Sequence, residues 1–267
     1  MKSVEKRALE AFNQNKDYFQ MMRRWHSKRA DGARLESEVE DLLVRYARGK
    51  VLDAGCGEGA LIKWILKHVH PKEVYGVDAS KIGVQMAQRS VKNKRAHFRQ
   101  SNLKALPFPP GFFDFIVCHS VLEHVVDYPK ALKEFFRVLK PGGKLLIRLG
   151  NEHGLAKPQF LLNCLLGRNK THPENPKLKL RKGCFEDHMS NFDVNVIPSD
   201  VLLQDVKKAG FDTMYFSTGF KSYVQLPDFK KEPWIKKSVI RFLARFPVFP
   251  FNHLGGLILI LGEKPCE

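Results

Sequence analysis

The sequence predicts an α/β fold, with a mainly parallel sheet and helices on both of its faces. The first observation is an apolar run that ends in an acid and then in alternating glycines, at residues 51–59. The second is a helical pattern that follows at once, at residues 60–68. The third is the alternation of strand-like and helix-like segments through residue 150. Such alternation is typical of parallel strands joined by right-handed crossovers.

The glycine turn indicates a ligand site. Gly55, Gly57 and Gly59 alternate directly after the first strand. Glycine has no Cβ and adopts positive φ at little cost, so the backbone can approach a ligand closely here. Ligands of open α/β sheets bind beyond the C-terminal ends of the strands. We therefore expect a cofactor at this turn.

Two kinds of cofactor compete for the turn. Gly55, Gly57 and Ala60 fit the G-x-G-x-x-G/A pattern of nicotinamide and flavin sites, and Asp78 follows about 20 residues on, where an acid binds the ribose. Asp53 argues against that interpretation, because its carboxylate would repel a pyrophosphate in a partly desolvated cleft. The same carboxylate suits S-adenosylmethionine, which carries an ammonium, a sulfonium and a ribose. Charge matching favours S-adenosylmethionine.

Five sequence blocks follow one another at residues 51–59, 74–80, 98–108, 113–124 and 134–147. On these blocks the chain resembles the class I S-adenosylmethionine-dependent methyltransferases, in the subgroup that includes the ubiquinone and menaquinone biosynthesis enzymes. The resemblance covers residues 50–150, just over a third of the chain. It implies a seven-stranded, mainly parallel Rossmann-like sheet with N-terminal helices. The family pattern thins out after residue 150, and from the basic residues of 154–182 we expect an insertion over the active site.

The resemblance also implies which residues bind the cofactor. Asp53 and the glycine turn would bind the methionine end, Asp78 the ribose, and Asn102 with the Leu103 backbone the adenine. The family usually has Asp where Asn102 stands, but an Asn side chain still accepts through its carbonyl oxygen. The full predicted set is Asp53, Gly55, Cys56, Gly57, Gly59, Asp78, Ala79, Asn102, Leu103 and His119.

An acceptor hydroxyl must lose a proton, and a histidine at the edge of the sheet is a candidate base. The candidates are His119 after the fourth strand, His153 after the fifth, and His188, which has Asp187 beside it. The alternatives are a backbone contact to the cofactor at His119 and an exposed loop at His188. We expect no metal site, because Cys184 and His188 alone supply too few ligands.

Length and cysteine usage predict how the chain is organised. Its 267 residues suffice for one full core, which we divide into an N-terminal helical segment, 1–48, and a methyltransferase domain, 49–267, with a variable acceptor region at 151–250. The five cysteines show no C-x-x-C pair, which favours a reduced, cytoplasmic location. We see no signal peptide and no apolar run of the roughly 20 residues that span a bilayer.

The formal net charge of +17 favours an acidic partner such as nucleic acid, anionic lipid or phosphate, although a solvated basic surface is the alternative. Residues 234–251 place apolar side chains on one helical side and basic ones on the other. This pattern predicts peripheral binding to an anionic membrane, or else a core-packing helix.

Three functions remain open from the sequence. The preferred one is methyl transfer to an O, N or C atom of a small or lipid-linked acceptor, such as a quinone precursor, a polyprenyl-type lipid or a glycan intermediate. The net charge also permits an RNA methyltransferase, although the sequence shows no aromatic–basic platform. The third is a non-catalytic S-adenosylmethionine-binding module, which the presence of both Asp53 and Asp78 argues against.

Overall fold

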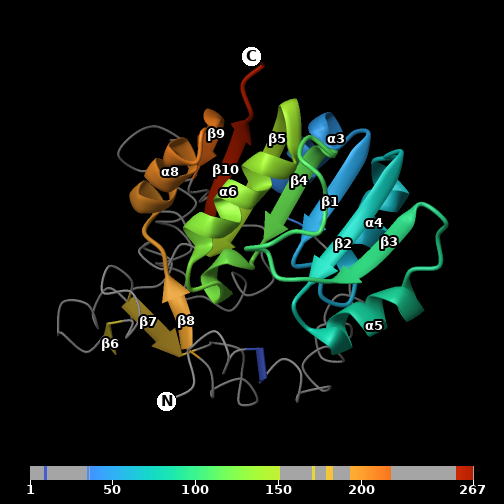
Figure 1. Ribbon diagram of the computed structural model, residues 1–267, viewed down its shortest axis with the longest axis horizontal. Helices are drawn as coiled ribbons and strands as arrows, with labels where there is room; N and C mark the ends of the chain where they lie inside the picture. The colour runs from blue at the N-terminus through green and yellow to red at the C-terminus, as the bar shows by residue number, and fades with distance from the viewer. Residues whose placement is uncertain are drawn as a thin grey trace, which may run out of the picture.

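The computed structural model describes residues 9–10, 35, 37–150, 170–171, 179–182, 193–217 and 257–266. Its main feature is a seven-stranded sheet in the order β3-β2-β1-β4-β5-β10-β9 (Figure 1). The strands are β1 Lys50–Ala54, β2 Glu73–Asp78, β3 Ala96–Gln100, β4 Phe113–His119, β5 Leu139–Gly150, β9 Asp212–Ser217 and β10 Leu257–Glu263.

The pairing of the strands confirms the predicted fold class. Strands β1 to β5 pair in parallel, and β10 is antiparallel to both of its neighbours, β5 and β9. The strand order reverses between β1 and β4, which is the switch point where ligands of such sheets bind. The predicted final strand, 257–261, continues to Glu263 and is inserted beside the edge strand β9.

Helices cover both faces of the sheet. They are α3 Ser37–Tyr46, α4 Ala60–His68, α5 Lys81–Ser90, α6 Tyr128–Val138 and α8 Ser199–Lys208. One hydrophobic core lies between the sheet and α6 and α8, and a second lies between the sheet and α3 and α4 (Figure 1). The central strand β4 is apolar and almost wholly buried, as expected for a parallel strand covered on both faces.

The fifth strand of the sheet contains a Pro-Gly-Gly run at residues 141–143. Such a run is typical of a turn, but β5 begins before it, at Leu139. Phe113 lies opposite Leu139 and Phe115 lies opposite Lys144, so the four intervening residues form a bulge in the pairing. A Cβ at Gly143 would lie 2.8 Å from the Lys140 carbonyl oxygen, so the bulge needs a glycine there.

The predicted insertion contains a second, antiparallel sheet in the order β6-β7-β8. Its strands are β6 Lys170–Thr171, β7 Lys179–Lys182 and β8 Asp193–Val196. Strand β8 contacts the short 3-10 helix η1 (Leu122–His124), and Ile197, which follows β8, is buried in the core beside α6 and α8. The predicted amphipathic segment, 234–251, lies outside the described residues. Among the described helices, none combines the length and the apolar character that a bilayer span requires.

Within the described residues of the N-terminal segment, the helix α3 packs against the core. In α3, Val39 and Leu43 are buried against β1 and α4, together with Ala47 after the helix. Their spacing matches the helical pattern in the sequence. The division of the chain at residue 48 stays a prediction, although α3 shares a core with the segment that follows it.

Candidate functional site

The glycine turn between β1 and α4 has left-handed backbone at each of its three glycines. The φ angles are +97° at Gly55, +49° at Gly57 and +85° at Gly59. A Cβ on Gly55 would overlap the side chain of Val121, so both the backbone angle and the available space require glycine. Gly59 is the N-cap of α4, so the helix begins directly at the turn.

Hydrogen bonds attach this turn to the end of β2. The N–H groups of Gly55 and Cys56 donate to the Val77 carbonyl at 2.8 and 3.0 Å. The Gly57 N–H donates to Asp78 Oδ2 at 2.9 Å. The structure therefore brings Asp78 into the glycine turn, although the two segments are 21 residues apart in sequence.

Asp78 has a structural role at the turn, besides the ribose binding that the sequence predicts. Its second oxygen, Oδ1, accepts from the Ser80 N–H at 2.8 Å, so the carboxylate also shapes the chain as it enters α5. Burial raises the pKa of Asp78, although the two backbone hydrogen bonds act in the opposite direction. A carboxylate has about four acceptor positions. Two therefore remain for the ribose hydroxyls that the sequence assigns to this residue.

Asp53 is the most unusual group at the site. It is 2 % exposed, and its Oδ2 has no hydrogen-bond partner among the described residues. Burial raises the pKa of Asp53 well above its ordinary value, and the nearby carboxylates of Asp78 and Glu58 raise it further. An unpaired buried acceptor costs about 1–3 kcal/mol, and more when it is charged. Asp53 therefore fits a ligand that brings a cationic donor.

Glu58 is a second buried acid at the turn, and sequence reasoning did not single it out. It is 7 % exposed and lies inside the glycine turn, between Gly57 and Gly59. Its position within the glycine motif is the sequence feature that could have identified it as a site residue. With Asp53 and Asp78 it gives the turn three acidic side chains, a set that suits an ammonium or sulfonium and opposes a pyrophosphate.

The predicted adenine loop begins at the end of β3. The Ser101 N–H donates to the Asp78 carbonyl at 2.9 Å, which brings the loop to the same edge of the sheet. Asn102 is exposed, and its Oδ1 accepts from the Lys104 N–H at 2.9 Å, so one lone pair of the amide oxygen is already used. Leu103 is buried in the core beside α6. Both residues follow β3 at this edge of the sheet, and the Asn102 side chain shapes the turn; adenine binding by them stays a prediction.

Cys56 and Ala79 complete the predicted set around the turn. The Ala79 carbonyl accepts from the Gln100 side chain at 3.0 Å, which joins the ends of β2 and β3. Cys56 is buried, and burial together with the neighbouring Asp53 raises the pKa of its thiol well above the ordinary value. The thiol is therefore kept protonated and unreactive, and it fills space under the turn.

His119 lies at the C-terminal end of β4, next to the acidic turn. Asp53 pairs with Val117 in the β1–β4 register, so His119 follows one step further along the same face. Arg148 of β5 lies opposite His119 in the β4–β5 register. Of the other candidate bases, His153 and His188 lie outside the described residues.

Comparison with known proteins identifies the domain. A protein family described as "Methyltransferase domain" matches residues 52–147. The demethylmenaquinone methyltransferase of Thermus thermophilus is 33% identical over 109 residues, which are 40% of this chain and 50% of that protein. The ubiquinone/menaquinone biosynthesis C-methyltransferase of Yersinia pestis is 37% identical over 37% of this chain and 41% of its own length. The chain thus spans about half the length of these curated relatives.

Solved structures show the same fold. A methyltransferase from Haloferax volcanii, in a complex with the Trm112 activator, has a TM-score of 0.63 at 16% identity and covers 95% of this chain and 97% of its own. A Mesorhizobium loti S-adenosylmethionine-dependent methyltransferase has a TM-score of 0.61 at 15% identity, over 86% of this chain and 97% of its own.

Residues 52–147 therefore contain a methyltransferase domain, and the sheet around them has the fold of solved S-adenosylmethionine-dependent methyltransferases. Over the matched part of the chain, the relatives include methyltransferases of ubiquinone and menaquinone biosynthesis. S-adenosylmethionine is the cofactor that this class implies, in preference to the nicotinamide and flavin alternatives.

Proposed function

We propose that this protein transfers a methyl group to an O, N or C nucleophile of a small or lipid-linked acceptor, such as a quinone precursor, a polyprenyl-type lipid or a glycan intermediate. The observation that carries the proposal is the buried, unpartnered oxygen of Asp53 beside the glycine turn. Relatives named as demethylmenaquinone methyltransferases support a quinone precursor among these acceptors.

S-adenosylmethionine supplies an electrophilic methyl group on a sulfonium. In the proposed role, Asp53 binds its ammonium, Asp78 its ribose, and Asn102 with the Leu103 backbone its adenine. Burial of Asp53 strengthens such a pairing, because charges interact more strongly away from water. The rigid turn then fixes the direction in which the methyl group points, and correct alignment of the reactants can lower the barrier by several kcal/mol.

On the acceptor side we assign His119 as the candidate base for an acceptor hydroxyl. It is half-buried and lies on the same face as Asp53, one step nearer the end of the strands. A histidine is the usual residue for this role, because its imidazole can both accept and donate a proton. His153 and His188 remain candidates on sequence grounds.

The basic charge and the amphipathic segment, 234–251, support a cytoplasmic protein that binds an anionic membrane surface where a lipid-linked acceptor is presented. An RNA acceptor is the second candidate, because a charge of +17 also suits a polyanion.

Binding of the cofactor tests the first part of the proposal. We expect S-adenosylmethionine and S-adenosylhomocysteine to bind in calorimetry, and NADH not to bind. Asp53→Asn should weaken S-adenosylmethionine binding tenfold or more, because it removes a charge-assisted hydrogen bond. Asp127→Asn is the matched control, since Asp127 is a surface acid paired with Lys130. If both variants bind S-adenosylmethionine with the same affinity, the assignment of the cofactor to this site is wrong.

Transfer of a labelled methyl group can identify the class of the methyl acceptor. The protein and S-adenosylmethionine with a tritiated methyl group are incubated with a cell extract, which is then separated into lipid, small-molecule and RNA fractions. We expect the label in the lipid or small-molecule fraction with wild type and not with Asp53→Asn. Label confined to RNA would replace the first candidate by the second.

A further inference from the structure

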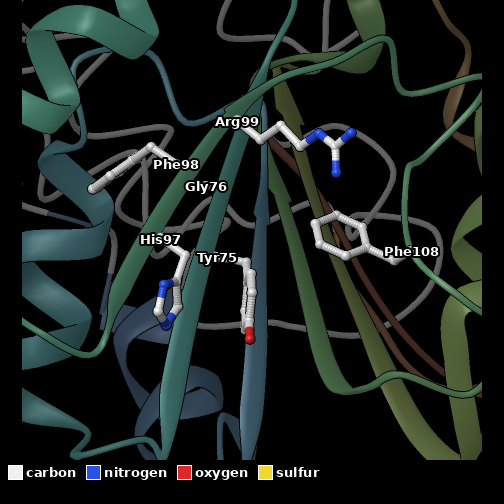
Figure 2. Close-up of a pocket in the computed structure, with 6 residues that line it drawn as sticks. All are labelled: Tyr75, Gly76, His97, Phe98, Arg99 and Phe108. Carbon is white, nitrogen blue, oxygen red and sulfur yellow. The ribbon is translucent and has the colours of Figure 1, made fainter.

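A pocket of about 200 Å³ lies on the β2–β3 side of the sheet, away from the residues assigned to the cofactor (Figure 2). Its lining residues are Tyr75, Gly76, His97, Phe98, Arg99 and Phe108. None of them belongs to the predicted methyl-transfer site. The pocket therefore needs an explanation of its own.

The pocket exists because the connection from β3 to β4 forms no helix. Residues 101–112 are turns and irregular chain, so in the described part of the structure no helix covers β2 and β3 on the face where α6 covers β4 and β5. His97 and Arg99 on this face are exposed.

Side chains alternate between the two faces of β2 and β3, and this alternation decides which of them form the walls of the pocket and where its floor is backbone. Side chains of Tyr75, His97 and Arg99 stand on the open face, while the Phe98 side chain points away from it and packs in the core beside α3 and α4 (Figure 2). A Cβ on Gly76 would lie 2.7 Å from Ile62 and 2.8 Å from Phe98, on the α4 side of the sheet, so Gly76 turns its backbone toward the pocket. The floor between the walls is therefore flat backbone.

The aromatic wall is held rigidly. Phe108 lies edge-on to Tyr75 with ring centroids 5.6 Å apart, and it stacks on Phe112 at 5.5 Å. The carbonyls of Leu106 and Phe108 accept from the Arg137 guanidinium of α6 at 3.0 and 2.8 Å. A wall fixed in this way loses little freedom when a ring stacks against it.

The pocket also carries a cation, Arg99, which has no acidic partner among the described residues. No hydrogen bond or ion pair joins the Arg99 guanidinium to the residues that the structure describes. The acid of this face, Glu73, is already engaged by the Tyr75 hydroxyl at 3.1 Å, by His97 at 3.6 Å and by Lys50 at 3.8 Å. In Figure 2 the guanidinium of Arg99 extends from β3 toward the side where Phe108 lies.

We propose that this pocket binds a nucleotide, with its base against Phe108 and Tyr75 and its phosphate on Arg99. A flat floor with aromatic walls suits a planar ring, and a guanidinium pairs with a phosphate through two parallel hydrogen bonds. The nucleotide comes either as a free mononucleotide or as one residue of a single-stranded RNA, which the net charge of +17 would attract. The sequence alone does not reveal this platform, because its members lie between residues 75 and 108 and only the sheet brings them together.

The test uses the full chain saturated with S-adenosylhomocysteine, so that the adenosine part of the cofactor site is filled. UMP, a short oligouridine and inorganic phosphate are titrated separately by calorimetry. We expect UMP and the oligouridine to bind, and Arg99→Gln to weaken both by tenfold or more. Phe108→Leu should weaken them as well while leaving S-adenosylhomocysteine binding unchanged. Arg89→Gln, an exposed arginine exchange on α5, should leave all affinities at the wild-type level.

Comparison of UMP with the oligouridine distinguishes a free mononucleotide from single-stranded RNA as the natural ligand. An oligouridine that binds more tightly than UMP, with a steep loss of affinity in salt, indicates RNA, whereas equal affinities indicate a free nucleotide. The site is refuted if neither ligand binds, if Arg99→Gln binds like Arg89→Gln, or if inorganic phosphate binds as well as UMP. Because cofactor binding is followed in the same samples, failure here leaves the methyl-transfer proposal standing.

Discussion

Arg148 and Ser120 are linked twice at the exit of β4. The Arg148 guanidinium donates to the Ser120 hydroxyl, and the Ser120 N–H donates to the Arg148 carbonyl at 2.8 Å. Ser120 has a φ of 55°, in the left-handed region that serine rarely adopts. This strained residue directly follows His119, and strain of this kind collects at functional sites. The pair therefore fixes the direction in which the chain leaves β4 beside the cofactor turn.

Replacement of Ser120 separates backbone strain from the hydrogen bond. Ser120→Ala keeps the unfavourable φ and loses the acceptor for Arg148, so the free energy of unfolding should fall by about 1–3 kcal/mol. Ser120→Gly loses the same bond but relieves the strain, so we expect it to be more stable than the alanine variant by up to about 1 kcal/mol. Urea unfolding at pH 7 measures both, and a glycine variant less stable than the alanine variant would contradict this account.

Gly55→Ala should damage the cofactor turn. The added methyl group overlaps Val121 at a φ of +97°, so we expect a loss of more than about 2 kcal/mol in unfolding free energy and weaker S-adenosylmethionine binding. Val121→Ala in the same chain should restore part of the loss by making room. Gly111→Ala is the control, because Gly111 has a φ of +65° but nothing within 4 Å of an added Cβ. Equal losses at the two glycines would show that backbone strain alone matters.

We expect the buried carboxyl group of Asp53 to lower the stability of the ligand-free protein when it is ionised, although its charge serves ligand binding. Its pKa is raised in the folded protein, so at intermediate pH the folded state binds more protons than the unfolded state. Stability from this group is therefore complete below the ordinary Asp pKa and is lost as the pH rises through the raised value.

Asp53→Asn removes that titration. Without ligand, the variant should be more stable than wild type at neutral pH, and the difference should shrink as the pH falls below the ordinary Asp range. The same variant should bind S-adenosylmethionine poorly. Thermal unfolding from pH 4 to pH 8, with and without the ligand, measures both effects. A variant less stable than wild type at pH 7 would show that the Asp53 charge is stabilised within the ligand-free protein.

Glu134 and Arg137 should contribute to stability with the opposite dependence on pH. The Arg137 guanidinium lowers the pKa of Glu134, which also accepts from the Leu106 N–H at 2.8 Å. This contribution is present above the ordinary Glu pKa and is lost as the pH falls through the lowered value. Glu134→Gln should therefore cost about 1.5–3 kcal/mol at pH 7 and progressively less in acid.

Urea unfolding at several pH values tests this expectation. Asp127→Asn provides the comparison, because the Asp127–Lys130 pair is largely exposed, with its two side chains 40% and 69% accessible, and exposed pairs contribute little to stability. If Glu134→Gln costs no more than Asp127→Asn at pH 7, the buried network around Leu106 contributes little.

Local patterns in the sequence predicted individual elements well. The helix expected at residues 60–68 is α4 Ala60–His68, because its apolar spacing and the glycine before it are both local signals. The bulge at the start of β5 was missed, because a Pro-Gly-Gly run reads as a turn and only the pairing with β4 keeps it in the sheet. Glu58 was passed over although it lies within the motif, since nothing local shows that its side chain is buried.

The sequence by itself determined the cofactor class, because an acid followed by alternating glycines sets both the charge and the backbone of the turn within a few residues. Only the tertiary structure decided which distant groups meet. In the folded chain the Gly57 N–H donates to Asp78, and Arg148 lies opposite His119. Arg99 and Phe108 line the same pocket. The physical reason is that strand order and register arise from packing of the whole core, so neighbours across a sheet leave no mark in the local spacing of residues.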